Sequence, residues 1–379
     1  MATELSVLVV GGGPAGLSSA ISLRQHGYAV DVVEKHSLDR VQGSELMLPM
    51  MLFPTLTRLG LLDACMAEGV GGRNLLLSPA PGVQPISIPM PGTADAPDGG
   101  PTGIGISRPV LYRLLRDAAE RHGARLTGNL ALMGVDQDDD GVVARLSDGS
   151  SARYDLLVAA DGVFSDTRRM VFPEIGDPPL TGQVAWRTRL PRVGDGCPEL
   201  TAIYYGPERR KVGLINAADD CMYLFMLEPA PEGRIDPDRL SVELKARLAD
   251  FGGYVAQARD RIEAGTTTYF TKLHRMLVPE PWFRGRVVLA GDAAHGVTPH
   301  LAYGAGLSIE DGVVLADCLA AADTVDKALL AYTERRFGRC RDAVEACRLL
   351  GESELDPQGV TSDPMKVNAE AWARLSQPI

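Results

Sequence analysis

The chain is poor in cysteine and has no cysteine pair with the spacing of a metal site. Its 379 residues include 6 cysteines, none of them in a C-x-x-C motif. Neither a disulfide framework nor a zinc site is indicated, and we expect no bound metal. Because no secretory leader is recognisable either, we expect a reducing, cytoplasmic environment.

The chain also lacks an excess of positive charge and a long apolar run. Its formal net charge is -11, which argues against nucleic acid and against anionic membrane surfaces as partners. No apolar stretch reaches the roughly 18 residues of a transmembrane helix. With 45% hydrophobic and 23% charged residues, the composition is that of a globular protein, and the length suggests about two or three domains.

The strongest local feature is an apolar run that leads directly into a glycine-rich turn. Residues 7–16 read VLVVGGGPAG, a G-x-G-x-x-G motif with Gly11, Gly13 and Gly16 in register. Glycines at these positions allow a tight turn, close approach of the backbone to a pyrophosphate, and close packing of helix on strand. A dinucleotide site is therefore indicated.

The residues after this turn supply the context that such a site requires. A helix is predicted over 17–25, and a second apolar strand over 29–33 ends in Glu34. Glu34 lies near the spacing of about 20 residues expected for a carboxylate that binds a ribose hydroxyl. The alternative is an ordinary glycine-rich turn with a surface glutamate.

The middle of the chain has a different texture. Strands alternate with turns, and one helix is predicted over about 237–251, which indicates a second, antiparallel domain. We expect residues 46–62 to form a packed helix or a wall near a ligand, and the polar last 25 or so residues to wrap loosely. The strands predicted in the middle region cover residues 183–190, 201–205, 211–215, 222–227 and 266–271.

Two further motifs follow predicted buried strands. Residues 161–169 read DGVFSDTRR, and residues 291–295 read GDAAH. The second motif continues through Pro299 to residues 304–311, GAGLSIED. Taken singly, Asp161 could be an Asx-turn residue and Asp292 a helix N-cap.

In this order and spacing, the three motifs resemble those of the single-component FAD-dependent aromatic hydroxylases, the family of p-hydroxybenzoate hydroxylase and salicylate hydroxylase. The resemblance covers about residues 5–350. It implies an α/β fold, in which a Rossmann-like FAD-binding domain is interrupted by an antiparallel-sheet substrate domain and followed by C-terminal helices. The implied boundaries are 1–78, 103–181 and 272–324 for the FAD-binding domain, 79–102 and 182–271 for the substrate domain, and 325–379 for the C-terminal helical segment and tail.

The resemblance also implies which residues bind FAD, without a covalent link. Glu34 would hold the adenosine ribose, Arg108 the pyrophosphate or ribityl region, and Asp292 the ribityl chain. The turn from Pro299 to Gly306 would edge the flavin, and a helix starting near Leu307 would favour the negative charge of the reduced ring. The full expected set is Gly11, Gly13, Pro14, Ala15, Gly16, Glu34, Lys35, Arg108, Asp161, Asp292, Gly304, Ala305 and Gly306.

The implied reaction is hydroxylation of a small aromatic molecule, phenolic or heteroaromatic. NADH or NADPH would reduce FAD, and dioxygen would then give a flavin hydroperoxide that transfers one oxygen. No second G-x-G-x-x-G is present, so the nicotinamide would dock transiently. Alternatives are a flavin-dependent reductase or oxidase of the same fold, or a non-catalytic flavin redox sensor. The expected state is a monomer or homodimer.

The substrate is expected between the flavin and the antiparallel sheet. Arg187 would bind an anionic group, and alternation along the strands predicts that only half of the candidate side chains point inward. His300, next to Pro299, could deprotonate a phenol, or it could only cap the following turn. Pro299 and His300 are the catalytic candidates, and the substrate candidates are Arg187, Tyr204, Tyr223, Phe225 and Tyr303, with Trp186 and Met226 beside them.

Overall fold

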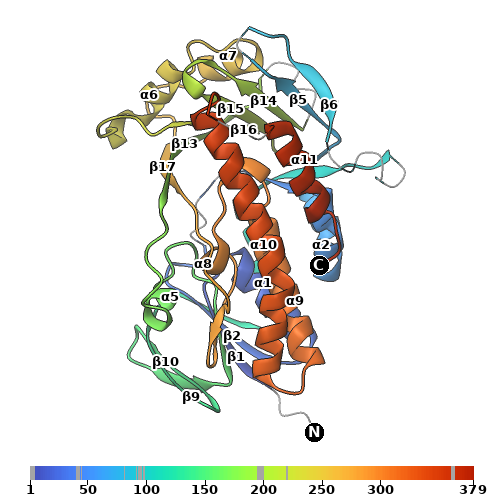
Figure 1. The fold of residues 1–379 in the computed structure, drawn as a ribbon, viewed down its shortest axis with the longest axis vertical. Coiled ribbons are helices and arrows are strands. Elements are labelled where there is room, and N and C mark those ends of the chain that lie inside the picture. Colours follow the sequence, from blue (N-terminus) through green and yellow to red (C-terminus); the bar gives the residue numbers. More distant parts are fainter. Residues whose placement is uncertain are drawn as a thin grey trace.

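The computed structural model describes residues 5–39, 43, 45–80, 82–90, 92, 96, 99–193, 200–218, 221–359 and 363–379. Two sheets lie at opposite ends of an elongated molecule, and one long helix runs beside both (Figure 1). In the part of the chain described, no helix is both long and apolar enough to cross a bilayer.

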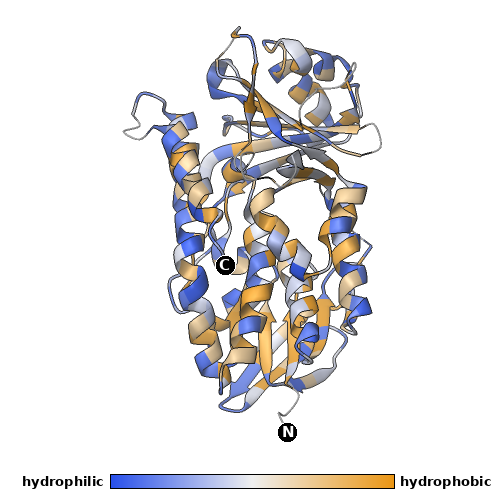
Figure 2. Ribbon diagram, turned by 90° about the vertical axis from the view of Figure 1, so that its right-hand side faces the viewer, coloured by the Kyte–Doolittle hydropathy of each residue, from blue (hydrophilic) through white to orange (hydrophobic). Residues whose placement is uncertain are grey.

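The first sheet has six strands in the order β18-β19-β12-β1-β2-β8. Its central strands run parallel and read as continuous apolar segments, because protein covers both of their faces. Residues 7–9, for example, are successive and fully buried, and Figure 2 shows these strands as a hydrophobic layer among helices. The strands are β1 (Ser6–Val10), β2 (Ala29–Glu34), β8 (Arg125–Gly128), β12 (Leu156–Ala159), β18 (Phe283–Arg284) and β19 (Val287–Leu289).

Three helices pack together beside the six-stranded sheet: α1 (Pro14–Gln25), α4 (Arg108–Arg121) and α9 (Gly304–Ala321). The Ser107 hydroxyl caps α4 by accepting from the Val110 amide. A short antiparallel sheet of β9 (Leu132–Asp138), β10 (Gly141–Leu146) and β11 (Ser151–Tyr154) lies near the end of the molecule.

The second sheet has seven strands in the order β17-β13-β16-β15-β14-β5-β6. Helices α6 (Leu240–Arg247) and α7 (Gly253–Asp260) cover one of its faces. The single helix predicted over 237–251 is therefore shorter than expected, and a second helix follows it. The other face is turned toward the glycine-rich turn between β1 and α1. The strands are β5 (Asn74–Ser78), β6 (Ile86–Pro89), β13 (Leu180–Pro191), β14 (Thr201–Tyr205), β15 (Lys211–Asn216), β16 (Cys221–Pro229) and β17 (Thr268–His274).

The connection between the two regions departs from the sequence prediction. Residues 46–62 do not form one packed helix. The chain first forms β3 (Glu45–Pro49), which pairs with β7 (Gly103–Ser107), and β7 also pairs with β4 (Val70–Gly72). Pro49 ends that strand, and the short helices η1 (Met50–Leu52), α2 (Phe53–Arg58) and α3 (Leu62–Glu68) follow. Strand β5, expected in the first domain, pairs with β14 in the seven-stranded sheet.

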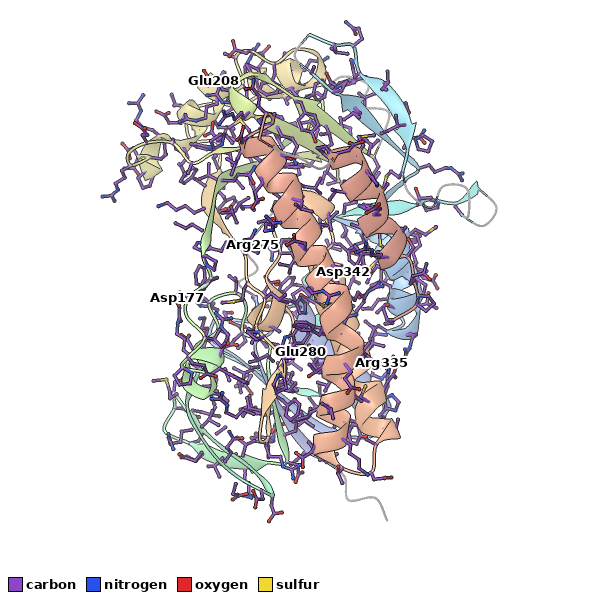
Figure 3. The ribbon with its side chains drawn as sticks, viewed as in Figure 1. Asp177, Glu208, Arg275, Glu280, Arg335 and Asp342 are labelled. Atoms are coloured by element: carbon purple, nitrogen blue, oxygen red, sulfur yellow. The ribbon has the colours of Figure 1, made fainter. Side chains whose placement is uncertain are left out.

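The C-terminal region is more ordered than predicted. Helix α10 (Val325–Leu355) runs along the molecule, and α11 (Pro364–Leu375) packs against it with Trp372 and Leu375 buried. The prediction of a loose tail, made from the polar composition, is wrong over these residues. The Asp363 side chain caps a helix that has an apolar face. Figure 3 labels Arg335 and Asp342 along α10, and Asp342 accepts from Arg374 of α11 at 3.2 Å.

Candidate functional site

A cavity of about 960 Å³ lies between the glycine-rich turn and the inner face of the seven-stranded sheet. Its volume is near the upper end of the range that small-molecule and cofactor sites occupy. Residues from all three sequence motifs meet there. The predicted site residues that line it are Gly11, Gly13, Pro14, Ala15, Glu34, Lys35, Arg108, Asp161, Arg187, Tyr223, Phe225, Asp292, Pro299, Gly304 and Ala305.

Two glycines of the glycine-rich turn, Gly11 and Gly16, have no room for a side chain. Gly11 has φ +111°, and an added Cβ would overlap the carbonyl oxygen of Ala160. A Cβ on Gly16 would overlap the carbonyl oxygen of Gly11, so Gly16 brings α1 against the turn and does not line the cavity. The N-cap residue of α1 is Gly13, which has no side chain to cap the helix. Its first amides are therefore available to an anionic ligand.

Glu34 holds this turn from the end of β2. One carboxylate oxygen accepts from the Gly12 amide at 2.8 Å, and the other accepts from the His36 amide at 2.9 Å. The carboxylate lies in the cavity wall. Each oxygen retains acceptor capacity, which fits a ligand hydroxyl such as that of a ribose.

Arg108 offers an unsatisfied donor to the cavity. It stands at the first position of α4, directly after the Ser107 cap. Its Nε is buried and has no hydrogen-bond partner among the described residues. A buried N–H donor without an acceptor fits an anionic group, and the diphosphate of FAD is such a group.

Asp292 is the first residue of α8 (Asp292–His295), directly after Gly291. Much of its surface is exposed and it lines the cavity, while protein atoms of the cavity walls surround the carboxyl group. Burial raises the pKa of Asp292, while His295 and Arg108 oppose the increase. No hydrogen bond to its side chain is found within the described ranges. A carboxyl group placed in this way fits a hydroxyl-rich chain such as ribityl.

Asp161 has a local structural role. Its carboxylate accepts from the Ser165 hydroxyl and from the amide and hydroxyl of Thr167, the last two at 2.9 Å. It thus holds the start of α5 (Asp166–Val171), which matches the turn alternative. A direct contact with the cofactor stays a prediction.

Arg168 joins two motifs that are far apart in the sequence. Its guanidinium donates to the Val163 oxygen at 2.7 Å and to the Ala293 oxygen at 2.9 Å. It is fully buried, and burial lowers its pKa. The sequence placed Arg168 inside a motif without assigning it this role.

The turn that follows α8 forms another wall of the cavity. Thr298, Pro299 and Ala302 line it, and α9 begins at Gly304, three residues before the predicted start. Tyr303, the N-cap residue of α9, makes no capping side-chain bond, and the positive end of the helix faces the cavity because Gly304 and Ala305 line it. Gly306 lies outside the lining, and an added Cβ there would be 2.6 Å from the Tyr303 ring.

One face of the seven-stranded sheet closes the far end of the cavity. The register sets Arg187 beside Phe225 on one side and Tyr269 on the other. Arg187 Nη1 donates to Thr271 Oγ1 at 2.6 Å, and no carboxylate pairs with Arg187 in the described part of the chain. The apolar residues of this wall include Ala185, Ile215, Leu227 and Leu273.

The opposite face of the same sheet holds three of the predicted substrate candidates. Trp186, Tyr204 and Met226 are buried against α6 and α7 in a separate core. The expectation that Tyr204 contacts substrate is therefore wrong, and so is the placement of Trp186 and Met226 near it. The physical reason is the two-residue period of a strand, which sends neighbouring side chains to opposite faces.

Tyr303 also points away from the cavity. Its side chain is 2% exposed, and its hydroxyl donates to Glu310 Oε1 at 2.6 Å. Glu310 in turn accepts from Arg336 at 2.8 Å and from Arg339 at 2.7 Å. This buried network occupies Tyr303, and the prediction of a substrate contact is corrected.

The same network contains a possible set of metal ligands. Ligand atoms of His295, Asp311 and Cys340 lie within 4.8 Å of one another. However, His295 Nε2 is 2.6 Å from Asp311 Oδ2, and Arg336 Nε donates to Asp311 Oδ1 at 2.7 Å. Although burial opposes ionisation, His295 and Arg336 lower the pKa of Asp311 to about 2. Direct ion pairs thus fill the space between these groups.

His300 does not reach the cavity. Its side chain is 1% exposed and lies between Thr298 Oγ1, 2.8 Å from Nδ1, and Glu354 Oε2, 3.1 Å from Nε2. In the tight turn η5 (Pro299–Leu301), Pro299 faces the cavity while His300 faces α10. We therefore correct the prediction that His300 is a base that touches substrate.

Comparison with known proteins agrees with this geometry. Residues 4–347 match a family described as FAD binding domain. The chain is 32% identical over 362 residues to the aurachin C monooxygenase/isomerase of Stigmatella aurantiaca, covering 93% of this chain and 90% of the relative. It is 31% identical over 328 residues to the 2-heptyl-3-hydroxy-4(1H)-quinolone synthase of Pseudomonas aeruginosa, covering 83% and 81%.

A solved structure shares the fold over nearly the whole chain. It is HpxO of Klebsiella pneumoniae complexed with FAD and uric acid, with a TM-score of 0.83, 25% identity, and coverage of 98% of this chain and 92% of that one. The family resemblance inferred from the three motifs is confirmed. The chain belongs to the family of single-component FAD-dependent monooxygenases that hydroxylate aromatic molecules, and its cofactor is FAD.

Proposed function

We propose that this enzyme uses NAD(P)H and dioxygen to hydroxylate a nitrogen-containing aromatic ring that carries a carbonyl or anionic oxygen. The observation that carries the proposal is that one continuous cavity joins the glycine-rich turn to the inner face of the seven-stranded sheet. Cofactor and substrate would therefore meet inside the protein, away from bulk water.

FAD, when bound, accepts reducing equivalents from NAD(P)H and activates dioxygen. The chain would hold it with the first amides of α1, the carboxylate of Glu34, the guanidinium of Arg108 and the carboxyl group of Asp292. The uncapped start of α9 would stabilise negative charge at the opposite end of the cofactor. For the residues that line the cavity, these proposed roles are the same as those predicted from the sequence.

The substrate would lie against the inner face of the seven-stranded sheet. Tyr223 and Phe225, with ring centroids 5.9 Å apart, offer an aromatic wall for a flat ring. Arg187 and Thr271 offer donors for one oxygen of that ring. A charged donor in a wall that is largely apolar and aromatic favours a substrate with an acceptor at one defined position.

The names of similar proteins support this ring type. Relatives of this chain include the quinolone synthase described above and a FAD-dependent urate hydroxylase of Klebsiella oxytoca, which is 28% identical over 353 residues. Quinolone and urate rings both contain nitrogen and a ring carbonyl oxygen. We extend to this chain only that shared chemistry.

The location of the enzyme, its oligomeric state and its division into domains are also part of the proposal. We infer a cytoplasmic enzyme, because the described cysteines are free and most are buried, and we propose that it is a monomer or a homodimer. We also keep the division into a discontinuous FAD-binding domain, a substrate domain and a C-terminal helical segment, with β5 assigned to the substrate domain.

The test is a substrate screen with the FAD-loaded protein. Quinolones, purines and phenolic acids would be compared for stimulation of NADH and NADPH oxidation, dioxygen uptake and product mass, with isotopically labelled dioxygen. We expect a ring with a carbonyl oxygen to stimulate oxidation and to gain one labelled oxygen atom. Oxidation that no ring stimulates, with all reducing equivalents recovered as hydrogen peroxide, would instead identify a flavin-dependent oxidase.

A further inference from the structure

A buried group of polar side chains lies directly behind the cavity wall formed by the turn Thr298–Ala302. We call this group, His300, Glu354, Lys211 and Gln183, the turn anchor. Glu354 Oε2 accepts from Gln183 Nε2 at 2.9 Å and lies 3.1 Å from His300 Nε2, and Glu354 Oε1 pairs with Lys211. The Lys211 and Glu354 side chains are each only 10% exposed. None of the four residues lines the cavity.

The turn anchor joins three separate parts of the fold. Gln183 belongs to β13 and Lys211 to β15, and Lys211 lies opposite Leu227, which lines the cavity from the same face of the sheet. Glu354 belongs to the last turn of α10. The anchor therefore connects the substrate-domain sheet and the C-terminal helix to a turn in the cofactor wall.

Charge and hydrogen-bond donors are matched within the anchor. Burial opposes the charges of Lys211 and Glu354, but their mutual attraction raises the pKa of Lys211 and lowers that of Glu354 to about 2. Burial and the nearby Lys211 lower the pKa of His300, which is therefore neutral. With Nε2 facing a carboxylate, we assign the proton to Nε2 and let Nδ1 accept from the Thr298 hydroxyl.

Helix α10 has a glycine at the point where it contacts Gln183 and His300. An added Cβ on Gly351 would be 3.0 Å from Gln183 Oε1 and 3.2 Å from His300 Cε1. Glycine is unfavourable inside a helix, and here it makes room for the His300 ring. One turn earlier, the Cys347 thiol donates to the Thr298 oxygen at 3.3 Å. Both Thr298 and His300 are thus held from the same helix.

We propose that His300, Glu354 and Lys211 are positioning residues that fix the Thr298–Ala302 wall of the cofactor cavity against α10 and the substrate-domain sheet. The inference rests on the proposed function, because the wall borders cofactor and substrate only if both occupy this cavity. Removing Glu354 would leave a buried cation and a buried donor without an acceptor. The turn would then relax toward other hydrogen bonds and alter the surroundings of the flavin.

The test compares Glu354→Gln with Glu345→Gln, which removes an exposed carboxylate from the same helix. For Glu354→Gln we expect a changed visible absorption spectrum of bound FAD and a Kd for FAD raised about tenfold, as for the loss of one buried hydrogen bond. The fraction of NAD(P)H oxidation that ends in hydrogen peroxide should also rise. Glu345→Gln should match the unaltered protein in all three measurements.

Conservative and non-conservative changes at His300 separate positioning from packing. His300→Gln keeps a donor toward Glu354 and should retain the spectrum, whereas His300→Leu should not. The double variant Lys211→Met/Glu354→Met removes both charges together and keeps the protein folded if the single variants unfold. We expect the FAD-free double variant to stay folded and its flavin spectrum to be altered, because His300 and Gln183 still lack their acceptor.

Folded Glu354→Gln and His300→Leu proteins with unaltered flavin spectra, FAD affinity and peroxide yield would overturn the inference. Failure of the proposed function would look different. The unaltered protein would hydroxylate none of the rings, while the spectral differences among the variants persisted.

Discussion

The two ends of the cavity present different kinds of groups to a ligand. At the cofactor end, the groups that we propose to bind FAD are largely backbone amides, those of the glycine-rich turn and of the uncapped starts of α1 and α9. At the sheet end, side chains from β13, β16 and β17 form the wall. The first end depends on backbone shape and tolerates few changes. The second can change its chemistry residue by residue, which allows one fold to serve several substrates.

The largest effect is expected from adding a single methyl group at the cofactor end. In Gly16→Ala the new Cβ would overlap the Gly11 carbonyl oxygen, so the turn or α1 must shift, at a cost of about 3 kcal/mol. We expect little bound FAD and a clearly lower melting temperature. Gly176→Ala is the control, because no atom lies within 4 Å of its added Cβ. A Gly16→Ala protein that binds FAD normally would contradict this account of the turn.

The second-largest effect is expected from removing the Asp292 side chain at the cofactor end, which should weaken FAD binding. Asp292→Ala removes a carboxyl group with no hydrogen-bond partner in the described structure, and about 1–3 kcal/mol of binding, or roughly one to two decades in the Kd for FAD, should be lost. Asp326→Ala, which removes an acid from the first turn of α10, should leave the Kd unchanged. Titration of the FAD-free proteins with FAD measures both. Equal affinities would reassign Asp292 to a purely helical role.

At the sheet end, a charge can be removed without disturbing the cofactor. Arg187→Met should raise KM for a stimulating ring by about 10- to 100-fold, the value of one charge-assisted hydrogen bond. FAD affinity should not change, because Arg187 and the glycine-rich turn lie at opposite ends of the cavity. Arg234→Met, at an exposed position, serves as the control. A parallel loss of FAD affinity would show that the two ends are not separable.

The smallest effect is expected on the far face of the same sheet. Tyr204→Phe should leave KM and kcat unchanged, because Tyr204 packs in the core with α6 and α7. Tyr223→Phe, on the cavity face, should alter KM. Steady-state kinetics on the two variants compares the faces directly, and a kinetic change confined to Tyr204→Phe would reverse our assignment of them.

What the sequence predicts depends on how local the determining contacts are. Gly11, Gly13, Gly16 and Glu34 act within one strand-turn-helix unit, so their spacing alone indicated a dinucleotide site. Which face of the sheet Tyr204 occupies depends on the register of β14 against β15. A short sequence motif does not encode that register. Alternation still predicted that half of the aromatic candidates would point away.

His300 and Tyr303 show a different limit. Their place in a glycine-rich turn near Pro299 suggested the cavity, but their partners, Glu354 and Glu310, come from helices that follow later in the chain. Helix α11 was missed for a related reason. Its polar composition hid the Asp363 cap and the apolar face that Trp372 and Leu375 present to α10.

The most direct measurement of the central claim is a titration of the FAD-loaded protein with a stimulating ring, followed by the visible spectrum of the flavin. If cofactor and substrate share one cavity, the ring should change the spectrum saturably, with a Kd that rises in Arg187→Met. Binding of the ring by calorimetry without any change in the flavin spectrum, and with equal affinity in Arg187→Met, would contradict the account.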